Sequence, residues 1–296
     1  MKERTKAINS PFRYPGGKFY ARKQILPLIP KHSVYCEPFA GGASIFFAKE
    51  LADKNYLNDL DKELINCYRQ IKNNLPSLLK EISGFAATPE NHQYFKFSYD
   101  ANTNIKKAAR WFYLNRTSFS GIMKMSNNGW GYGEKYSMPP ERWPAMLENV
   151  SKRIKNVTFS SLDFEEVIED LPKGTFAFID PPYYNARQDK LYTCSFKKDD
   201  HIRLSKCLYR ARKKITFLLT YDNSDEISEM YDWCNSSATT WNYTLARTDD
   251  QIRGLNLSDG FKSNRSLGKE LFLSNYTLYN IPKKIGVPRA QEIFQN

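Results

Sequence analysis

The nine residues TFAFIDPPY, from Thr175 to Tyr183, join an apolar run to a rigid polar turn. Residues 175–179 have the length and composition of a buried strand, so the turn that begins at Asp180 lies at the carboxyl end of that strand. Ligands of open α/β sheets bind outside the carboxyl ends of the strands. The stretch therefore predicts an α/β fold with a binding site at Asp180.

The four residues of the turn suit recognition of a planar amino group. A carboxylate oxygen of Asp180 and the backbone carbonyl of Pro181 can both accept hydrogen bonds from an exocyclic NH2, and Pro182 has no competing N–H. Tyr183 supplies a flat face on which a base can stack. A proline-stiffened turn after a core strand is the alternative for the tetrapeptide alone. With the surrounding chain, the turn favours modification of a nucleobase amino group.

The segments around the turn alternate between strand and helix. Further strands are predicted at residues 34–38, 56–59, 157–160, 215–221, 239–245 and 271–275. Helices are expected over residues 21–29, from residue 45 and over residues 62–72. This alternation predicts a doubly wound, mostly parallel sheet of seven strands.

The alternation stops for roughly 85 residues after the helix at residues 62–72, a much longer interval than a strand–helix–strand unit of ~30 residues needs. The interval has helical periodicity over residues 105–114 and a glycine-rich, aromatic and basic stretch over residues 116–140. We predict a helical and hairpin insert that binds the substrate at residues 73–150. It divides a catalytic domain into residues 1–72 and 151–296.

The composition favours an acidic partner. The formal net charge of the 296 residues is +12, and the isoelectric point is near 9.3. Clustered Lys and Arg gain affinity for nucleic acid by releasing phosphate counterions, and the 15% of aromatic residues add stacking surfaces. Nucleic acid is the first candidate, although a merely basic surface explains the charge alone.

The five cysteines show no Cys-x-x-Cys pair, and the three histidines lie far apart without ligand spacing. We therefore expect neither a metal site nor a disulfide framework. The N-terminus lacks the apolar core of a signal peptide, and no apolar run approaches the ~20 residues of a membrane span. A cytoplasmic or nucleoid-associated protein fits these features.

A glycine turn opens the first candidate for a cofactor site. The segment EPFAGG, which begins at Glu37 and contains Phe39 and Gly41, follows the first strand and precedes a helix. Glycines there let a ligand approach the backbone closely. Glu37 would repel a pyrophosphate but attract a cation, so the turn favours S-adenosylmethionine (AdoMet) over a dinucleotide. An ordinary tight turn is the alternative.

Two acids follow the next strands in the same way. Asp59 comes about 20 residues after the glycine turn, where an acid commonly accepts hydrogen bonds from ribose hydroxyls. Asp163 and Phe164 follow the third strand, where an acid and an aromatic ring can contact adenine. Each acid can instead cap a helix. The order of the segments along the chain favours the cofactor interpretation.

These motifs resemble those of the Dam-like DNA adenine-N6 methyltransferases. The resemblance covers about residues 10 to 280 and rests on residues 12–18, 37–42, 58–59, 180–183 and 264–276 in the family's order. It implies a methyltransferase fold that binds AdoMet without a metal and methylates adenine N6. By the same resemblance, Tyr14, Lys18, Asp59 and Asp180 match positions that contact AdoMet.

The insert departs further from the family pattern. Residues 114–121 resemble the start of a DNA-contacting hairpin. Where GATC-specific enzymes carry a Tyr-Asn pair and a guanine-reading Arg, the matching positions here are Phe119, Ser120 and Lys124. Arg116 in the insert, with Arg187 and Tyr192 after the catalytic turn, are further candidates for DNA contacts. The recognition sequence is left open, GATC included.

The resemblance predicts a specific course of reaction. The protein flips one adenine out of double-stranded DNA, and the methyl group passes directly to N6 without a covalent enzyme intermediate. Cytosine-N4 methylation needs the same hydrogen-bond acceptors, and a catalytically idle DNA-binding protein of the same fold is a second alternative. Monomeric or weakly dimeric action, alone, beside a restriction endonuclease or in a phage, is compatible with the sequence.

Overall fold

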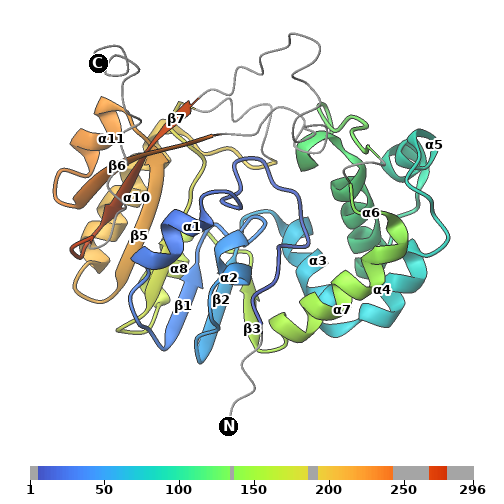
Figure 1. The fold of residues 1–296 in the computed structure, drawn as a ribbon, viewed down its shortest axis with the longest axis horizontal. Helices are drawn as coiled ribbons and strands as arrows, with labels where there is room; N and C mark the ends of the chain where they lie inside the picture. The colour runs from blue at the N-terminus through green and yellow to red at the C-terminus, as the bar shows by residue number, and fades with distance from the viewer. Residues whose placement is uncertain (1–5, 134–136, 186–192, 243–266, 279–296) are drawn as a thin grey trace, which may run out of the picture.

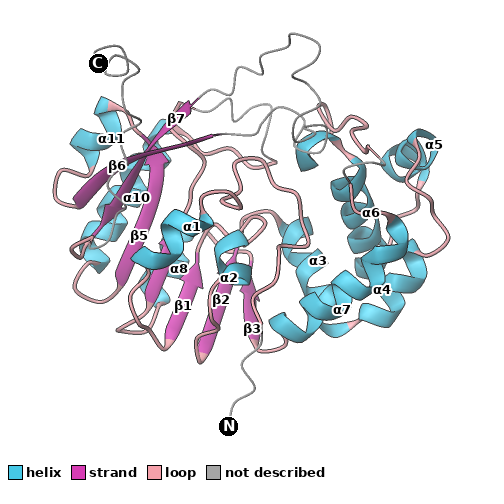
Figure 2. Cartoon of the chain, viewed as in Figure 1, coloured by secondary structure: helices cyan, strands magenta, loops and turns pink. Residues whose placement is uncertain are grey.

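The computed structural model describes residues 6–133, 137–185, 193–242 and 267–278. Within these residues seven strands form one sheet in the order β3-β2-β1-β4-β5-β7-β6 (Figures 1 and 2). The strands are β1 (Val34–Glu37), β2 (Lys54–Asn58), β3 (Val157–Ser160), β4 (Phe176–Ile179), β5 (Thr216–Asp222), β6 (Asn235–Asn242) and β7 (Leu267–Ser274). The chain order reverses between β1 and β4, which is where a doubly wound sheet opens a crevice.

The first five strands pair in parallel, and β7 lies antiparallel between β5 and β6. The predicted doubly wound, mostly parallel sheet of seven strands is thus confirmed. Both late strands begin earlier than predicted, at Asn235 rather than 239 and at Leu267 rather than 271. The first three residues of β6 are polar, and Gly268 and Lys269 interrupt the apolar pattern near the start of β7, so an apolar run alone does not mark either start.

Helices cover both faces of the sheet. They are α1 (Arg22–Ile25), α2 (Ser44–Ala48), α3 (Lys62–Asn73), α4 (Leu75–Ile82), α5 (Pro89–Gln93), α6 (Asn104–Thr117), α7 (Trp143–Ile154), α8 (Phe164–Asp170), α10 (Lys198–Ala211) and α11 (Asp225–Met230). Short turns of 3-10 helix are η1 (Leu26–Leu28), η3 (Phe119–Gly121) and η4 (Pro140–Arg142), and η2 (Tyr94–Ser98) is a π-helical turn.

Side chains alternate between the two faces along each central strand. On β4, Phe176 and Phe178 enter a core shared with α1, α2 and α3, whereas Ala177 and Ile179 enter a core shared with α8, α10 and α11. Burial of both faces explains why this strand reads as a continuous apolar run.

The residues predicted as an insert lie beside the sheet as a group of helices (Figure 1). Helix α6 packs against α3 and α4, and α7 packs against α3. Trp111 of α6 and Leu147 of α7 belong to the same continuous core as Leu64 of α3 and Tyr35 of β1. The insert therefore shares its core with one face of the sheet, and the domain boundaries at residues 72 and 150 stay a prediction.

Two local predictions differ from the structure. The helix expected over residues 21–29 changes to a 3-10 turn at Leu26, because Pro27 lacks the N–H that an α-helix would use there. In the insert, the expected hairpin is reduced, over its described residues, to one antiparallel bridge between Ser118 and Trp130. Glycines and prolines interrupt the alternation that a longer ladder needs.

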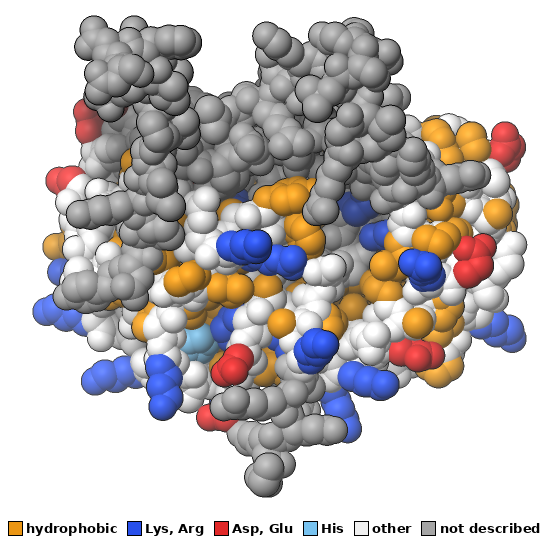
Figure 3. All heavy atoms as spheres, in the orientation of Figure 1, with side chains coloured by type: hydrophobic (Ala, Val, Ile, Leu, Met, Phe, Trp, Pro, Cys, Tyr) orange, Lys and Arg blue, Asp and Glu red, His pale blue; other side chains and the backbone are white. Residues whose placement is uncertain are grey.

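Among the described residues, the helices are too short or too polar to cross a bilayer. Lys and Arg side chains lie on both halves of the face drawn in Figure 3, where acidic side chains are fewer.

Candidate active site

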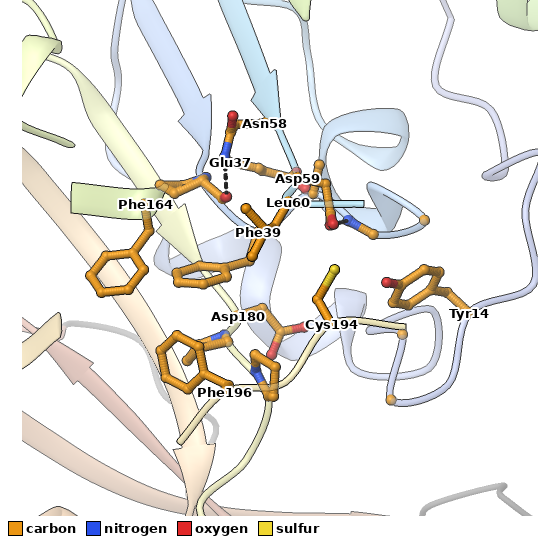
Figure 4. A pocket seen from close by; sticks show the side chains of 18 of the residues that line it. Tyr14, Glu37, Phe39, Asn58, Asp59, Leu60, Phe164, Asp180, Cys194 and Phe196 are labelled. Atoms are coloured by element: carbon orange, nitrogen blue, oxygen red, sulfur yellow. Dashed lines mark hydrogen bonds between the residues drawn. The ribbon is translucent and has the colours of Figure 1, made fainter. Parts of the chain in front are cut away.

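A cavity of about 470 Å³ lies at the carboxyl ends of β1, β2, β3 and β4. Its walls come from residues 14–18, 37–45, 58–60, 162–164, 180–183 and 193–196, with Phe178, Asn185, Asp200 and Asp222. Every predicted cofactor residue and the whole Asp180 to Tyr183 turn lie in these walls. Figure 4 shows the labelled side chains converging from separate elements.

The glycine turn after β1 packs against Tyr14. Gly41 has φ +45°, and a side-chain carbon there would lie 2.9 Å from Cε1 of the Tyr14 ring. The Gly41 N–H donates to Oδ2 of Asp59 at 2.9 Å. Only glycine meets both the positive φ and the close ring, so the turn has a conformation that a larger residue would disturb.

Asp59 links the glycine turn to the end of β2. Its Oδ1 accepts from the backbone N–H of Asp61 at 2.9 Å, and burial raises the pKa of its carboxyl to about 6. The N-cap of α3 is Asp61, whose Oδ1 accepts from the N–H groups of Glu63 and Leu64. The structure thus excludes the capping alternative for Asp59 and leaves its carboxyl at the cavity wall.

Glu37, at the end of β1, is 2% exposed. Its Oε1 accepts from the Tyr35 hydroxyl at 2.7 Å and from the Phe46 N–H at 2.8 Å. Burial raises the pKa of Glu37 to about 8, although both hydrogen bonds and Lys49 oppose the rise. A cation that entered the cavity would favour the ionised form of this carboxyl.

Three phenylalanine rings form an apolar wall. The Phe39 centroid lies 5.5 Å from that of Phe164 and 5.6 Å from that of Phe196, and all three lie near one another in Figure 4. Asp163 caps α8 by accepting from the Glu165 N–H at 3.0 Å. It also forms an ion pair with Arg203 at 2.6 Å. The capping alternative for Asp163 is therefore confirmed, and a contact with adenine stays a prediction.

Asp180 forms a buried ion pair with Lys18. The Lys18 ammonium lies 2.6 Å from Oδ1 and 2.8 Å from Oδ2 of Asp180, and it also donates to the Gly16 carbonyl at 3.0 Å. Thr220 of β5 donates to Oδ1 at 2.7 Å. Lys18 is 4% exposed and lies 4.8 Å from the centroid of the Tyr183 ring. A predicted cofactor residue thus contacts the predicted catalytic aspartate directly.

Asp222 at the end of β5 holds the chain that follows the catalytic turn. Its Oδ1 accepts from the Tyr184 N–H at 2.9 Å, and its Oδ2 accepts from the Asn185 side-chain amide at 2.8 Å. The Tyr184 ring packs edge-on to His201 at 5.1 Å. These contacts fix the direction of the backbone as it leaves the motif.

Sequence reasoning missed several residues of this cavity. They are Asn58, Cys194, Phe196, Thr220 and Asp222, all of which line it or contact a lining residue. Asn58 could have been found from the sequence, because an amide at a strand end can bridge neighbouring loops. In the structure, the Asn58 side-chain amide donates to the carbonyls of Pro38 and Leu162, each at 3.0 Å. The other four lack a local pattern.

The predicted DNA-binding residues lie in different environments. Phe119 and Lys124 are half-buried, and Ser120 is buried with φ +52°. Arg116 is only 9% exposed and donates to the Pro11 carbonyl at 3.4 Å, so it holds the N-terminal segment instead of facing solvent. Long basic side chains on helices also serve as internal braces, and the sequence does not separate the two uses. Arg187 and Tyr192 lie outside the described residues.

Comparison with known proteins gives one consistent family. A family model described as D12 class N6 adenine-specific DNA methyltransferase matches residues 14–265. The type II methyltransferase M1.LlaDCHI of Lactococcus lactis subsp. cremoris is 29% identical over 235 residues, which cover 73% of this chain and 82% of that protein. The type II methyltransferase M.MjaIII of Methanocaldococcus jannaschii is 31% identical over 255 residues, with 75% and 88% covered.

A more distant relative is named as an adenine methylase. The DNA adenine methylase of Haemophilus influenzae is 23% identical over 201 residues, which cover 64% of this chain and 68% of that protein. The family match spans strands β1 to β6 and the insert. The chain therefore belongs to the D12 class of N6 adenine-specific DNA methyltransferases, and its reaction is the transfer of a methyl group to adenine N6 in DNA.

Proposed function

We propose that the cavity holds AdoMet next to a flipped adenine and that Asp180 receives the N6 amino group. One observation carries the proposal: the glycine turn, Asp59, Phe164 and the Asp180 to Tyr183 turn, which are far apart in sequence, line a single cavity. A site of this kind at the switch point of an α/β sheet is the usual place for a nucleoside-containing ligand.

The lining groups fit AdoMet. Six acidic residues line the cavity, and the carboxyl groups of three of them, Glu37, Asp59 and Asp180, suit a ligand that carries an ammonium and a sulfonium. Asp59 would accept hydrogen bonds from the ribose hydroxyls, and the slot beside Phe39 and Phe164 would take the adenine ring. When bound, AdoMet supplies an electrophilic methyl group.

Asp180 would orient the substrate amine. In this structure the Lys18 ammonium contacts both of its carboxylate oxygens. We propose that the adenine N6 group takes the place of this ammonium and that the Pro181 carbonyl accepts its second hydrogen. Two acceptors aimed at N6 would turn its lone pair toward the methyl group and stabilise the positive charge that develops. Tyr183 would stack against the base.

The DNA duplex would lie across the insert. A second cavity of about 380 Å³ is lined by residues of α3 and α6 and by Lys124, and it shares Thr193 with the first cavity. The Thr193 hydroxyl donates to Asp61 at 2.8 Å, which places the two cavities side by side. Phe119 and Lys124, in the same part of the insert, would contact bases near the flipped adenine.

We also propose a role beside a restriction endonuclease. Two relatives are named type II methyltransferases, which supports such a role. A monomer is chemically sufficient for one methyl transfer. Light scattering of the protein with and without duplex DNA would measure the mass of the active species, and plasmid digestion after methylation would identify the endonuclease specificity that the modification blocks.

The experiment for the central proposal is transfer of labelled methyl groups from AdoMet to mixed-sequence duplex DNA, followed by mass spectrometry of the nucleosides. We expect N6-methyladenine from the wild-type protein and none from Asp180→Ala. Calorimetry with AdoMet alone then separates the two ligands, because Asp59→Ala should lose affinity for the cofactor in the absence of DNA. Equal product from wild type and Asp180→Ala would overturn the role of Asp180.

A further inference from the structure

A buried carboxyl group lies behind the catalytic turn without an evident structural use. Glu270 of β7 is 0% exposed, and no donor of the described residues meets either carboxyl oxygen in full hydrogen-bond geometry. Its backbone lies opposite Asp222 of β5 and Thr239 of β6. Burying a carboxyl costs several kcal/mol unless its surroundings compensate, so this position calls for an explanation.

The side chain projects toward the active site. Glu270 pairs with Asp222, and Phe272 pairs with Thr220, in the antiparallel ladder between β7 and β5. Paired residues share a face of a sheet, and positions two apart on one strand also share it. Phe272 belongs to the core on the face of Phe178, two residues before Asp180. Asp180, Thr220 and Glu270 therefore lie on one face.

Two hydroxyl groups lie between Asp180 and Glu270. The Thr220 hydroxyl donates to Oδ1 of Asp180 at 2.7 Å. Burial, together with nearby Glu270 and Asp180, raises the pKa of the Tyr183 hydroxyl well above its usual range, whereas Thr220 lowers it. The four side chains therefore lie close together in the order carboxylate, hydroxyl, hydroxyl, carboxyl, and the transfers from Thr220 to Tyr183 and from Tyr183 to Glu270 are part of the proposal.

Three charged groups near Glu270 affect the pKa of its carboxyl. Lys18 from the N-terminal segment favours the ionised form, whereas Asp180 after β4 and Asp222 on β5 oppose it. Burial is the largest cause, and it raises the pKa of Glu270 to about 8. A group that ionises near the working pH is suited to exchange protons there.

The reaction itself releases a proton. When the N6 lone pair forms the bond to the methyl carbon, the bond from that carbon to the sulfonium sulfur would break with its electron pair staying on sulfur, and the nitrogen would gain a substituent and a positive charge. One N6–H bond must then break, with its electron pair returning to nitrogen. Asp180 is the acceptor closest to that hydrogen in the proposed function, and this inference rests on that role.

We propose that Glu270 is the final acceptor of the N6 proton, which reaches it from Asp180 through the hydroxyl groups of Thr220 and Tyr183. The N6 proton passes to Asp180. Protonated Asp180 gives its proton to the Thr220 oxygen while Thr220 passes its own to Tyr183 and Tyr183 passes its own to Glu270. Asp180 is restored as a carboxylate, Glu270 becomes a neutral acid, and each hydroxyl keeps one hydrogen. Glu270 acts through other residues and touches neither substrate.

The first test is the pH dependence of single-turnover methyl transfer with enzyme in excess over DNA. Only the ionised form of Glu270 accepts a proton, so the wild-type rate should rise as pH increases, about tenfold between pH 7 and pH 9 for a pKa of about 8. Glu270→Gln keeps the shape of the side chain and should lose this rise. Thr220→Val should lose it as well, whereas Thr220→Ser retains the hydroxyl and should keep it.

The second test uses the protein without ligands. Infrared spectra recorded between pH 6 and pH 10 should show the C=O band of protonated carboxyls disappearing near pH 8 in wild type, and this loss should be smaller in Glu270→Gln, where Glu37 remains as a buried carboxyl with a pKa of about 8. Absence of that difference, or a rise with pH that survives in Glu270→Gln, would overturn the relay. Activity that survives in Asp180→Ala would instead contradict the proposed function, so the two failures are distinguishable.

Discussion

At the scale of single residues, the ion pair between Lys18 and Asp180 joins the two parts that we predict for the catalytic domain. The residues are 162 positions apart, and Lys18 is 4% exposed. An ammonium taken out of water at this depth needs a partner, because an uncompensated buried charge costs several kcal/mol. The pair therefore has a structural role in addition to the catalytic role proposed for Asp180.

Because of this ion pair, a substitution at Asp180 should lower stability as well as activity. Asp180→Ala is expected to abolish turnover and also to lower the free energy of unfolding by about 3 kcal/mol, since it leaves Lys18 buried without its carboxylate. Adding Lys18→Met should restore most of the stability but no activity. Urea unfolding and methyl transfer measured on the single and double variants check both parts; a fully stable single variant contradicts the structural role.

Residues that act locally were predictable, and residues that act across strands were not. The sequence alone identified Asp180, Asp59 and Gly41 as candidates, because each follows a strand and has a special chemistry or conformation. Thr220 belongs to β5, between β4 and β7, and Glu270 belongs to β7, between β5 and β6; these neighbours are set only by the sheet order. Arg116 was a candidate DNA contact because it lies in the segment that resembles a DNA-contacting hairpin, but the packing of α6 buries it.

At the scale of elements, the glycine turn after β1 leaves no room for a side chain at residue 41. Gly41→Ala would combine a φ of +45° with a side-chain carbon 2.9 Å from the Tyr14 ring. We expect AdoMet affinity to fall about tenfold, or ~1.4 kcal/mol, because Tyr14 must move out of the cavity wall. Gly84→Ala is the control: its φ is +83°, but nothing lies within 4 Å. Calorimetry should show unchanged AdoMet affinity for that variant.

The loop after α6 contains a second close approach. A side-chain carbon at Gly131 would lie 2.2 Å from Cα of Phe119, whereas one at Gly129 would meet open space. Gly131→Ala should therefore displace Phe119 and weaken DNA binding about tenfold, while AdoMet affinity stays the same. Gly129→Ala should bind DNA like wild type. Fluorescence anisotropy with labelled duplex compares the two, and equal affinities would exclude Phe119 from the DNA interface.

The elements themselves were predictable where their apolar pattern was strong. Strand β4 was recognised because its four residues are all apolar, as their complete burial requires. The fold of the insert was not, because its core is formed jointly by α3, α6 and α7, and a sequence pattern does not show which helices share a core. The start of β6 was missed because its first three residues are polar.

At the scale of the whole molecule, two buried acids couple stability to pH. Burial raises the pKa of Glu37 and of Glu270 from 4.5 to about 8 in the folded protein. The folded state then binds more protons than the unfolded state between these values, so stability is greatest at the low end of that range and falls as pH rises toward 8.

Glu270→Gln removes one of these groups. Between pH 5.5 and pH 7.5, its free energy of unfolding should fall less steeply than that of wild type, by at most about 1.4 kcal/mol per pH unit. Denaturant unfolding at several pH values, with Asp199→Asn on the exposed start of α10 as the control, measures the slopes. Parallel curves for wild type and Glu270→Gln would contradict a strongly buried ionisable group.

The position of β7 has a consequence for how the chain is made. Strand β7 is translated after β6 but lies between β5 and β6, and β6 pairs only with β7 among the described strands. Until Leu267–Ser274 has left the ribosome, one edge of β5 is unpaired and β6 lacks the strand with which it pairs. Glu270 also arrives with this last strand. In the proposed mechanism, a nascent chain that lacks β7 also lacks Glu270 and with it the end of the proton path, so the methylase would reach its full rate only after β7 has paired with β5.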